Sequence, residues 1–373
     1  MAATANINST LPPSGKTTTD ILESESSPNT LLDIEVAFLV LAFVMVAVGI
    51  VGNAIIIISG LRLPLTRKKG ITTGSRYYII NLALADIGVL AVASVTNLVP
   101  MLRPWNLGLF MCKVLLPLRD VLILVSLATI TILSLERYWL ITRPLLHNPK
   151  KSVAKSIILC IWLAAYLVNG VPLLLITRLR EMGEEKSCEY EWPSAKLLKV
   201  HVCIGVVITL VPLVVVTFCY VAIGMTLKEV YRRRKEMMHP AASDHGGNKN
   251  AVTLILRSKR LVKMLIVVVA TFTVCTLPAV LYALVHIFHK VEPFEHQHLL
   301  YTFFLCMMVS ESAFNPIILL LMASEYRLCI AESVRVLKKL RDACCCCVLF
   351  RKEVPSKAYR EILHDANLPT TPV

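Results

Sequence analysis

The stretch SESAFNPIIL (310–319) lies inside an apolar run that covers residues 299–322. A run of this length can cross the hydrocarbon core of a bilayer as an α-helix. Glu311, Asn315 and Pro316 interrupt it with a carboxylate, an amide and a residue that removes a helical hydrogen bond. Such groups are costly in lipid unless other protein groups satisfy them. The stretch therefore predicts a membrane helix whose polar side faces other helices.

The rest of the chain repeats this pattern of long apolar runs. Of its 373 residues, 56% are hydrophobic and 17% are charged, whereas soluble domains are about 45–50% apolar and about 25% charged. Because lipid offers the backbone no hydrogen-bond partners, each run should be helical. The sequence predicts an all-α membrane protein, a seven-transmembrane helix bundle, with spans near 35–61, 77–101, 112–140, 153–176, 200–227, 261–288 and 298–322.

The basic residues predict how the bundle is oriented. Most of the 39 lysine and arginine residues lie after the first, third, fifth and seventh runs. Since basic loops stay in the cytoplasm, we expect an extracellular N-terminus and a cytoplasmic C-terminus in the plasma membrane. The net charge of +14 is then a topology signal and an attraction to anionic membrane lipids, and no nucleic-acid partner is expected.

Four segments are expected along the chain. They are an extracellular tail (1–34), the bundle (35–322), a short amphipathic helix on the membrane surface (323–341) and a cytoplasmic tail (342–373). The surface helix is predicted from apolar residues spaced three and four apart, with basic residues largely off that line. A helix that frays into the cytoplasm is the alternative.

Both tails carry candidate modification sites. Asn8 begins an N-glycosylation sequence, which is useful only outside the cell. The juxtamembrane cysteines Cys344, Cys345, Cys346 and Cys347 are palmitoylation candidates. A zinc site is the alternative for this cysteine run, although contiguous ligands do not easily wrap one tetrahedral ion.

Short motifs occur in a fixed order through the seven runs. They are GNAIIII with Asn53, NLALADIGV with Asp86, LSLERYWLITRPL with Arg137, a tryptophan in the fourth run, Pro212 and Tyr220 in the fifth, FTVCTLP in the sixth and NPIIL in the seventh. In these motifs the chain resembles the rhodopsin-like (class A) G-protein-coupled receptors, from the first span to the tail. Each motif alone is weak, and their order makes the resemblance specific.

The resemblance implies a disulfide bond between Cys112, at the outer end of the third span, and Cys188, in the loop after the fourth. The oxidising exterior permits such a bond. Two free thiols are the alternative.

The resemblance also implies an activation switch at the cytoplasmic end. In the family the arginine of the third-span motif pairs with the preceding acid at rest, and prolines act as hinges. Snorkelling charges and static bends are the alternatives. The implied switch residues are Glu136, Arg137, Tyr138, Tyr220, Phe272, Pro278, Asn315 and Pro316. Thr276 and Leu319 depart from the family's tryptophan and tyrosine, so Phe272 is expected to carry more of the relay.

A polar cluster is implied in the middle of the bundle, where the family holds a sodium ion. Glu311 is this chain's own addition, since most members have asparagine there. Two carboxyl groups in one dry cavity share a proton or are neutralised by a cation. A protonated, hydrogen-bonded Glu311 is the alternative to ion binding. The cluster comprises Asp86, Ser126, Glu311, Ser312 and Asn315, with no other cofactor expected.

The outer half of the bundle indicates the ligand class. Arg119 stands where amine receptors carry an aspartate, and the seventh span lacks the lysine that retinal needs. Peptides, lipids and small anions remain. The sequence CEYEWP (188–193) resembles the corresponding loop of neuropeptide receptors, and its acids could attract a cationic peptide. A solvated loop without this role is the alternative. The candidate ligand-binding residues are Arg119, Asp120, Glu189, Glu191, Trp192 and Thr276. Neighbours on a helix point in different directions. The resemblance implies that Arg119 faces the cavity, where it could bind a peptide carboxylate or pair with an acid such as one from the outer loop.

The sequence thus predicts a receptor that binds an extracellular ligand, most simply a neuropeptide, and activates heterotrimeric G proteins, with arrestin as a further partner. No catalytic activity is expected. A class A receptor for a lipid or small anionic ligand is the alternative, and a membrane transporter is the alternative from a different class.

Overall fold

The computed structural model describes residues 28–62, 73–143, 151–183, 185–237, 248–289 and 297–322. Several predictions on the termini lie outside this part of the chain. They concern the glycosylation site at Asn8, the surface helix at 323–341 and the cysteines at 344–347.

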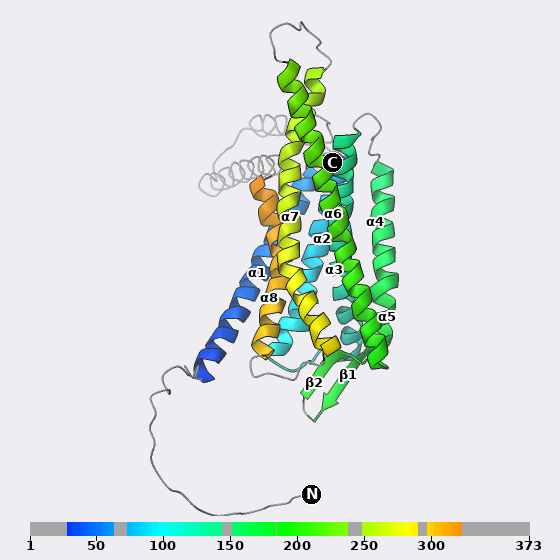
Figure 1. Ribbon diagram of the computed structural model, residues 1–373. Helices are drawn as coiled ribbons and strands as arrows, with labels where there is room; N and C mark the ends of the chain where they lie inside the picture. Colours follow the sequence, from blue (N-terminus) through cyan, green and yellow to red (C-terminus); the bar gives the residue numbers. More distant parts are fainter. Residues whose placement is uncertain are drawn as a thin grey trace, which may run out of the picture.

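Helices make up most of the fold and run side by side across the molecule (Figure 1). Their bounds are α1 Pro28–Arg62, α2 Thr73–Ala93, α3 Gly108–Thr142, α4 Lys151–Ala165, α5 Val171–Ile176, α6 Ala195–Met237, α7 Asn248–His289 and α8 Gln297–Met322. The π turns η2 (Ser94–Leu98) and η4 (Tyr166–Gly170) extend α2 and α4, and the 3₁₀ turn η3 (Val99–Met101) follows η2. Seven helical spans in the described residues are long and apolar enough to cross a membrane, which confirms the predicted bundle.

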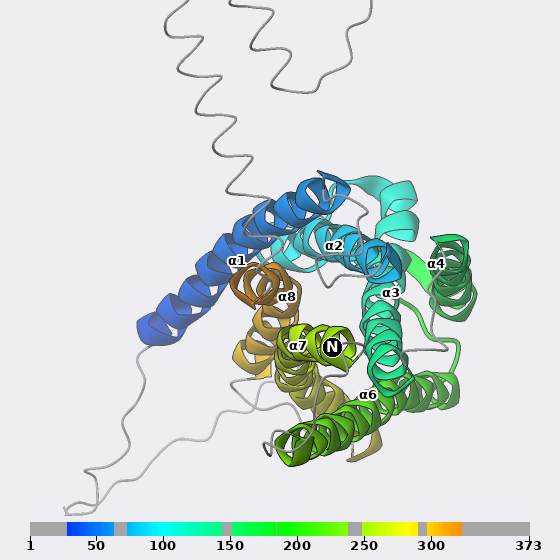
Figure 2. The same cartoon turned by 90° about the horizontal axis from the view of Figure 1, so that it is seen from above.

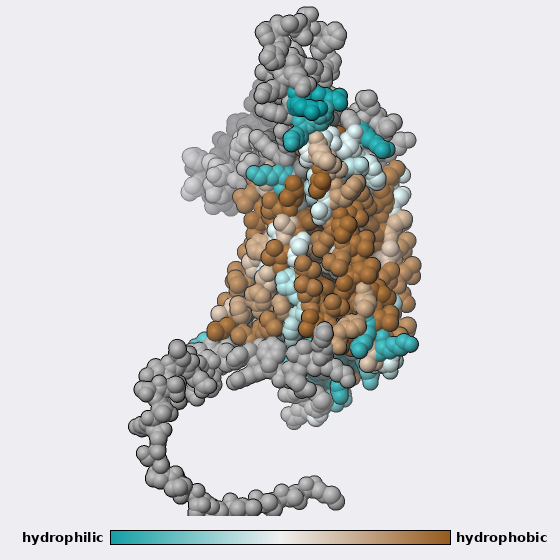
Figure 3. All heavy atoms as spheres, viewed as in Figure 1, coloured by the Kyte–Doolittle hydropathy of each residue, from teal (hydrophilic) through white to brown (hydrophobic). Residues whose placement is uncertain are grey.

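The outer surface of the bundle suits lipid. Large apolar side chains such as Val51, Leu159, Val214 and Leu321 are exposed along the spans. Figure 3 shows the result as a brown, hydrophobic middle zone with hydrophilic residues towards its ends. Apolar residues outside and polar groups inside are what a bilayer requires, because only the interior offers hydrogen-bond partners.

Figure 2 looks along the bundle and shows the helices arranged side by side. Buried polar side chains such as Asn81 and Asp86 make the interior of the bundle polar. Trp162 of α4 donates from Nε1 to Asn81 Oδ1 of α2 at 2.9 Å, and Asn81 donates to Thr129 Oγ1 of α3 at 2.8 Å. These buried bonds tie three helices together. On the opposite side, a Cβ added at Gly52 of α1 would lie 2.9 Å from Cγ of Pro316 in α8, so glycine permits this close approach.

The prolines expected to act as hinges lie inside continuous helices. Pro212 falls within α6, Pro278 within α7 and Pro316 within α8. Pro117 within α3 is a further internal proline that the sequence analysis did not select. Each removes one backbone donor from its helix, which makes these positions natural points of bending.

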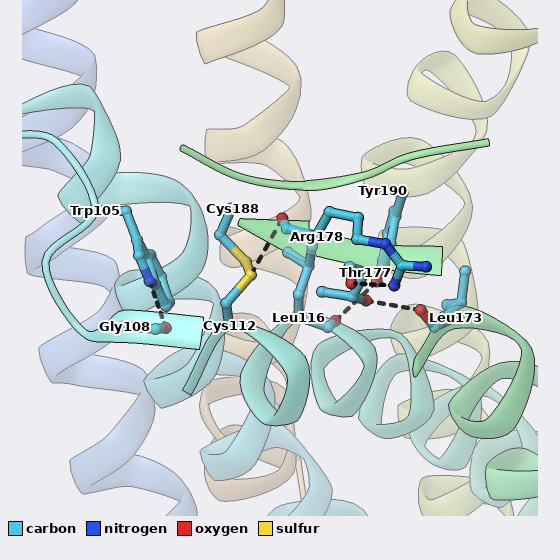
Figure 4. The surroundings of a disulfide bond; sticks show 9 residues. All are labelled: Trp105, Gly108, Cys112, Leu116, Leu173, Thr177, Arg178, Cys188 and Tyr190. Atoms are coloured by element: carbon cyan, nitrogen blue, oxygen red, sulfur yellow. Dashed lines mark hydrogen bonds between the residues drawn. A yellow bond between two sulfur atoms is a disulfide. The ribbon is translucent and has the colours of Figure 1, made fainter. Parts of the chain in front are cut away.

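A two-stranded hairpin closes one end of the bundle, as Figure 1 shows. Strand β1 (Thr177–Met182) pairs antiparallel with β2 (Glu185–Tyr190), and Gly183 supplies a positive φ in the turn. The sequence analysis treated this segment only as a loop. Cys188 of β2 bonds to Cys112 of α3 with an S–S length of 2.06 Å, so the implied disulfide is confirmed (Figure 4).

Candidate functional site

A charge pair on α3 lies beneath the hairpin. Arg119 Nη2 is 3.1 Å from Asp120 Oδ2, and its Nε also donates to Asp120 Oδ1 at 3.4 Å. Their side chains are only 18% and 24% exposed. The expectation that helix neighbours point apart is therefore wrong here, because the long Arg119 side chain bends back to the carboxylate of Asp120 in a half-buried space.

Two π turns bring asparagine side chains into hydrogen-bond contact with this pair. Asn97 of η2 accepts a 2.7 Å bond from Arg119 Nη1, and Asn169 of η4 donates to the main-chain oxygen of Asp120 at 3.3 Å. A π turn inserts one residue into the helical repeat and so re-aims the side chains that follow, and such turns are frequent at functional sites. Both re-aimed asparagines converge on the same dipeptide.

The hairpin supplies a fourth contact. The Tyr190 hydroxyl of β2 lies within hydrogen-bond distance of two acceptors, Asp120 Oδ2 and, at 2.9 Å, the main-chain oxygen of Leu116, and its single proton can be donated to either. Burial raises the pKa of the Tyr190 phenol well above its ordinary value, and the Asp120 carboxylate raises it further. The phenol consequently stays protonated at physiological pH and remains a donor. Four elements (η2, η4, α3 and β2) thus fix the Arg119–Asp120 pair.

A narrow cavity leads from this pair into the bundle. It has a volume of about 40 Å³, and Arg119 and Asn97 line one part of it. Its other lining residues include Thr276 and Phe272 of α7 and Glu311 of α8. Since one water occupies about 30 Å³ of liquid, a larger ligand group needs the surrounding helices to move apart. The cavity therefore connects the outer charge pair with the polar middle of the bundle.

Three acidic side chains in and directly after the hairpin each form an ion pair with a basic side chain of the hairpin. Glu189 lies 3.3 Å from Arg180, Glu191 lies 3.8 Å from Arg178, and Lys186 lies 2.7 Å from Glu181. All six side chains are well exposed, so water and salt screen the pairs. The acidic surface expected from these residues is therefore largely neutralised pair by pair.

Trp192 follows the hairpin and faces α6. Its ring lies 4.8 Å, centre to centre, from the ring of His201, and both residues are partly buried. This contact fixes the chain between the hairpin and α6 close to the charge pair.

Deeper in the bundle, five polar side chains are joined by hydrogen bonds. Asp86 accepts 2.9 Å bonds from Ser126 and from Asn315, and Asn315 also donates to Glu311 Oε1 at 3.2 Å. Ser312 donates to Glu311 Oε2 at 3.4 Å. All five are buried. The structure thus brings together the whole set of residues selected for a sodium site.

The donors of this cluster suit a hard cation. The cluster offers carboxylate, hydroxyl and amide oxygens, which such ions prefer. Asn315 Oδ1 is buried and has no hydrogen-bond partner within the described residues. A sodium ion would supply the missing partner and offset one of the two negative charges that Asp86 and Glu311 can carry. The residues present therefore fit the ion.

The end of the bundle opposite the hairpin holds four of the residues predicted for the switch, Glu136, Arg137, Tyr138 and Tyr220. Glu136 and Arg137 of α3 are 4% and 1% exposed. Glu136 accepts a short hydrogen bond from Ser75 of α2, and the Tyr220 hydroxyl of α6 lies 3.1 Å from Ser134 Oγ. Tyr138 packs on Phe218 of α6 at 5.9 Å between ring centres. These contacts join α2, α3 and α6 around Arg137.

Some residues that contact the Arg119–Asp120 pair or lie near it were not predicted from the sequence. Asn97, Asn169, Tyr190 and His201 were not selected. Tyr190 stood in the quoted loop sequence, and its position two residues after the bridging Cys188 was the available signal. No sequence signal marked Asn97 and Asn169, because a regular helix through either π turn would direct these side chains elsewhere.

The architecture places the chain in the class of seven-transmembrane receptors. The sequence model described as "7 transmembrane receptor (rhodopsin family)" matches residues 52–319. The chain therefore belongs to the rhodopsin family.

Among curated proteins, the chain is similar to several receptors. It is 28% identical over 295 residues to the Substance-P receptor of Canis lupus familiaris and to that of Homo sapiens, covering 76% of this chain and 67% of each relative. It is 27% identical over 290 residues to G-protein coupled receptor 54 of Oreochromis niloticus, covering 75% of this chain and 73% of that protein.

Proposed function

We propose that this protein is a plasma-membrane receptor that binds an extracellular peptide and activates heterotrimeric G proteins. Membership of the rhodopsin family supports the receptor class, and the similarity to Substance-P receptors supports a peptide ligand. In this proposal the bundle catalyses no reaction and acts only by changing its packing.

The proposed orientation has the hairpin outside and the ends of α6 and α7 that flank residues 238–247 in the cytoplasm. The positive-inside rule supports this assignment. The disulfide between Cys112 and Cys188 agrees with it, because disulfides persist in the oxidising exterior.

The Arg119–Asp120 pair is the observation that carries the proposal. A guanidinium in a half-buried site is expensive unless it is paired, and an intramembrane charge marks a functional site by default. Here the pair is held by Asn97 and Tyr190 at the head of a cavity. We assign Arg119 to an anionic group of the ligand, such as a peptide carboxylate, and Asp120 to holding the guanidinium in place.

We propose that the signal of ligand binding passes along the cavity into the bundle. A ligand group that enters beside Arg119 pushes against Thr276 and Phe272 of α7, and it approaches Glu311 of α8. Asp86, Ser126, Glu311, Ser312 and Asn315 would hold a sodium ion, which supplies positive charge to the two carboxyl groups when it is bound. These residues cross-link α2, α3 and α8, so a rearrangement of the cluster changes how the three helices pack.

The proposed output is at the cytoplasmic end. Arg137 is buried among α2, α3 and α6, and movement of α6 and α7 about Pro212 and Pro278 would expose it to the G protein. Arrestin is proposed as a second partner of the same surface.

The direct test is a peptide-library screen on cells that express the chain with a promiscuous G protein. A peptide that raises calcium only in expressing cells supports the proposal, and the Arg119→Ala variant should then respond weakly or not at all. Unchanged potency in Arg119→Ala would remove this residue from the site.

A lipid or small-anion ligand is the second candidate, because Arg119 suits any carboxylate or phosphate. The same cells can be treated with an acidic-lipid panel and a small-anion panel. Responses to these panels and not to peptides would favour this candidate. Ligand-independent uptake without G-protein activation would favour a transporter instead.

A further inference from the structure

A hydrogen bond between two side chains joins α3 to α6 near the end of the bundle opposite the hairpin. The Tyr220 hydroxyl of α6 lies 3.1 Å from Ser134 Oγ of α3, and Ser134 is fully buried. The Ser134 hydroxyl itself donates to the main-chain oxygen of Ile130 at 2.9 Å. Because a serine hydroxyl has a single proton, Tyr220 is the donor of the bond between the helices and Ser134 is its acceptor.

The contacts beside this bond are apolar. One turn further along α3, the Tyr138 ring lies 5.9 Å, centre to centre, from the Phe218 ring of α6. Ile141 of α3 and Ile223 of α6 belong to one buried cluster. Ser134, Tyr138 and Ile141 are spaced four and three apart and so share one face of α3. We call this contact between the two helices the α3–α6 seam, and Figure 2 shows α3 and α6 side by side.

The α3–α6 seam lies beyond the internal proline of α6. Pro212 stands eight residues before Tyr220, about 12 Å along the helix at ~1.5 Å per residue. Since Pro212 removes one main-chain donor, α6 bends most easily there, and bending moves the segment that carries Tyr220. The buried Arg137 lies one turn after Ser134 on α3. The seam must therefore change if α6 turns away from Arg137.

The hydrogen bond and the apolar contacts of the seam respond differently to such a movement. Apolar contact is non-directional and declines gradually as area is exposed. A hydrogen bond needs a donor–acceptor distance of about 3 Å and weakens steeply when its angle changes. The Tyr220 ring packs on a buried cluster that includes Leu133 of α3 and Val268 of α7. A tyrosine that leaves Ser134 within this apolar packing gives up its acceptor, and that cost opposes opening of the seam.

We propose that Ser134 is a positioning residue for Tyr220, and that the hydrogen bond between them is a latch that holds α6 against α3 in the inactive packing of the bundle. Bending of α6 at Pro212 breaks this bond and opens the α3–α6 seam. The direction of the effect on signalling rests on the proposed function, because there the release of α6 leads to G-protein activation. The role of the bond in holding the two helices together does not depend on that function.

A serine that serves only its own helix is the competing explanation, since Ser134 also bonds to Ile130. Thr131 provides the matched case on the same helix, because its hydroxyl donates to the main-chain oxygen of Leu127 at 2.9 Å. If the bond within α3 were the whole role of Ser134, removing either hydroxyl would have the same effect. The experiment therefore compares the two positions.

The test uses the full-length receptor in phosphatidylcholine nanodiscs without ligand. Arg143 of α3's C-cap and Lys228 of α6 are exposed and lie next to the seam. Both are replaced by p-acetylphenylalanine, whose ketone takes a spin label in the presence of the native cysteines. The distance between the two labels reports whether α6 lies against α3. Nucleotide exchange on a purified promiscuous G protein is measured in parallel with the unlabelled receptor.

Ser134→Ala removes the acceptor of the latch. It should lengthen the mean distance between the labels and raise ligand-free nucleotide exchange roughly threefold to tenfold, as the loss of one hydrogen bond allows. Tyr220→Phe removes the donor and should have the same effect, and the double variant should not exceed either single variant. Ser134→Thr keeps an acceptor hydroxyl and should restore the wild-type values. Thr131→Ala should match wild type in both measurements.

Three results would overturn the latch. They are a wild-type distance in Ser134→Ala, effects of Ser134→Ala and Tyr220→Phe that add in the double variant, and a fall in nucleotide exchange, which would assign the bond to the active packing. A longer distance in Ser134→Ala without exchange in any variant or in wild type would support the latch and contradict the proposed function alone. Thermal unfolding of each variant, compared with wild type, shows that it is folded.

Discussion

Two ion pairs near the outer end of the bundle use the same chemistry in different surroundings. Arg180 and Glu189 pair across the hairpin at 3.3 Å with side chains 63% and 43% exposed. Arg119 and Asp120 pair at 3.1 Å with side chains 18% and 24% exposed. Water screens the first pair, whereas neighbouring elements hold the second. From this difference we expect the half-buried pair, and not the charged hairpin, to contribute most to ligand recognition.

The largest expected effect comes from breaking the half-buried pair. Arg119→Ala leaves Asp120 without its cation and removes the anchor for an anionic ligand group. Truncating one partner of a buried charge pair costs several kcal/mol, so the potency of the screened peptide should fall by at least about thirtyfold. The matched control is Arg180→Ala on the hairpin. Similar losses in both variants would contradict the comparison.

The polar cluster of Asp86, Ser126, Glu311, Ser312 and Asn315 allows a second comparison, because it contains two buried carboxyl groups instead of an ion pair. Replacing Glu311 by Asn removes one of two buried carboxyl groups and keeps an amide in its place. The sensitivity of signalling to sodium, measured against choline, should then weaken strongly, and its pH dependence should change. Identical sodium and pH profiles in wild type and Glu311→Asn would make Glu311 purely structural.

A smaller effect is expected for the contact that connects the two outer regions. Tyr190→Phe removes the hydroxyl that joins the hairpin to Asp120 while keeping the ring. A hydrogen bond to a charged group contributes about 1.5–3 kcal/mol, so peptide potency should fall by at least about tenfold. Tyr166→Phe, at an exposed ring on η4, is the matched control and should behave as wild type. Equal losses of potency in Tyr190→Phe and Tyr166→Phe would show that the Tyr190 hydroxyl does not support the Arg119–Asp120 pair.

The smallest effect is predicted for the hairpin itself. Glu189→Gln removes an exposed ion pair worth at most about 1 kcal/mol, so potency should change by less than about fivefold. Raising the salt concentration should shrink the difference further. A loss as large as that of Arg119→Ala would restore the acidic loop as the main recognition surface.

The sequence predicted the structure best where a residue pattern is compatible with few structures. Long apolar runs predict the seven spans, since lipid allows little else than a helix. The four-residue spacing of Glu311 and Asn315 predicts their shared face, and Asn315 indeed donates to both Glu311 and Asp86. The resemblance to the rhodopsin-like receptors led to the Cys112–Cys188 bond.

It was less informative where local geometry departs from the regular helix. The π turns η2 and η4 bring Asn97 and Asn169 to the charge pair, and no periodicity indicates an inserted residue. The ion pairs of the hairpin depend on strand register, as in Glu181, which lies opposite Lys186 and pairs with it at 2.7 Å. That register was unknown while the segment was only a loop.

The central claim is that Arg119 and Asp120 act as one unit in ligand recognition. A double-mutant cycle tests it directly, with one peptide's potency measured on wild type, Arg119→Ala, Asp120→Asn and the double variant. If Asp120 acts through Arg119, the double variant should lose no more potency than Arg119→Ala alone. Losses that simply add would show that the two residues act independently, which would contradict the account.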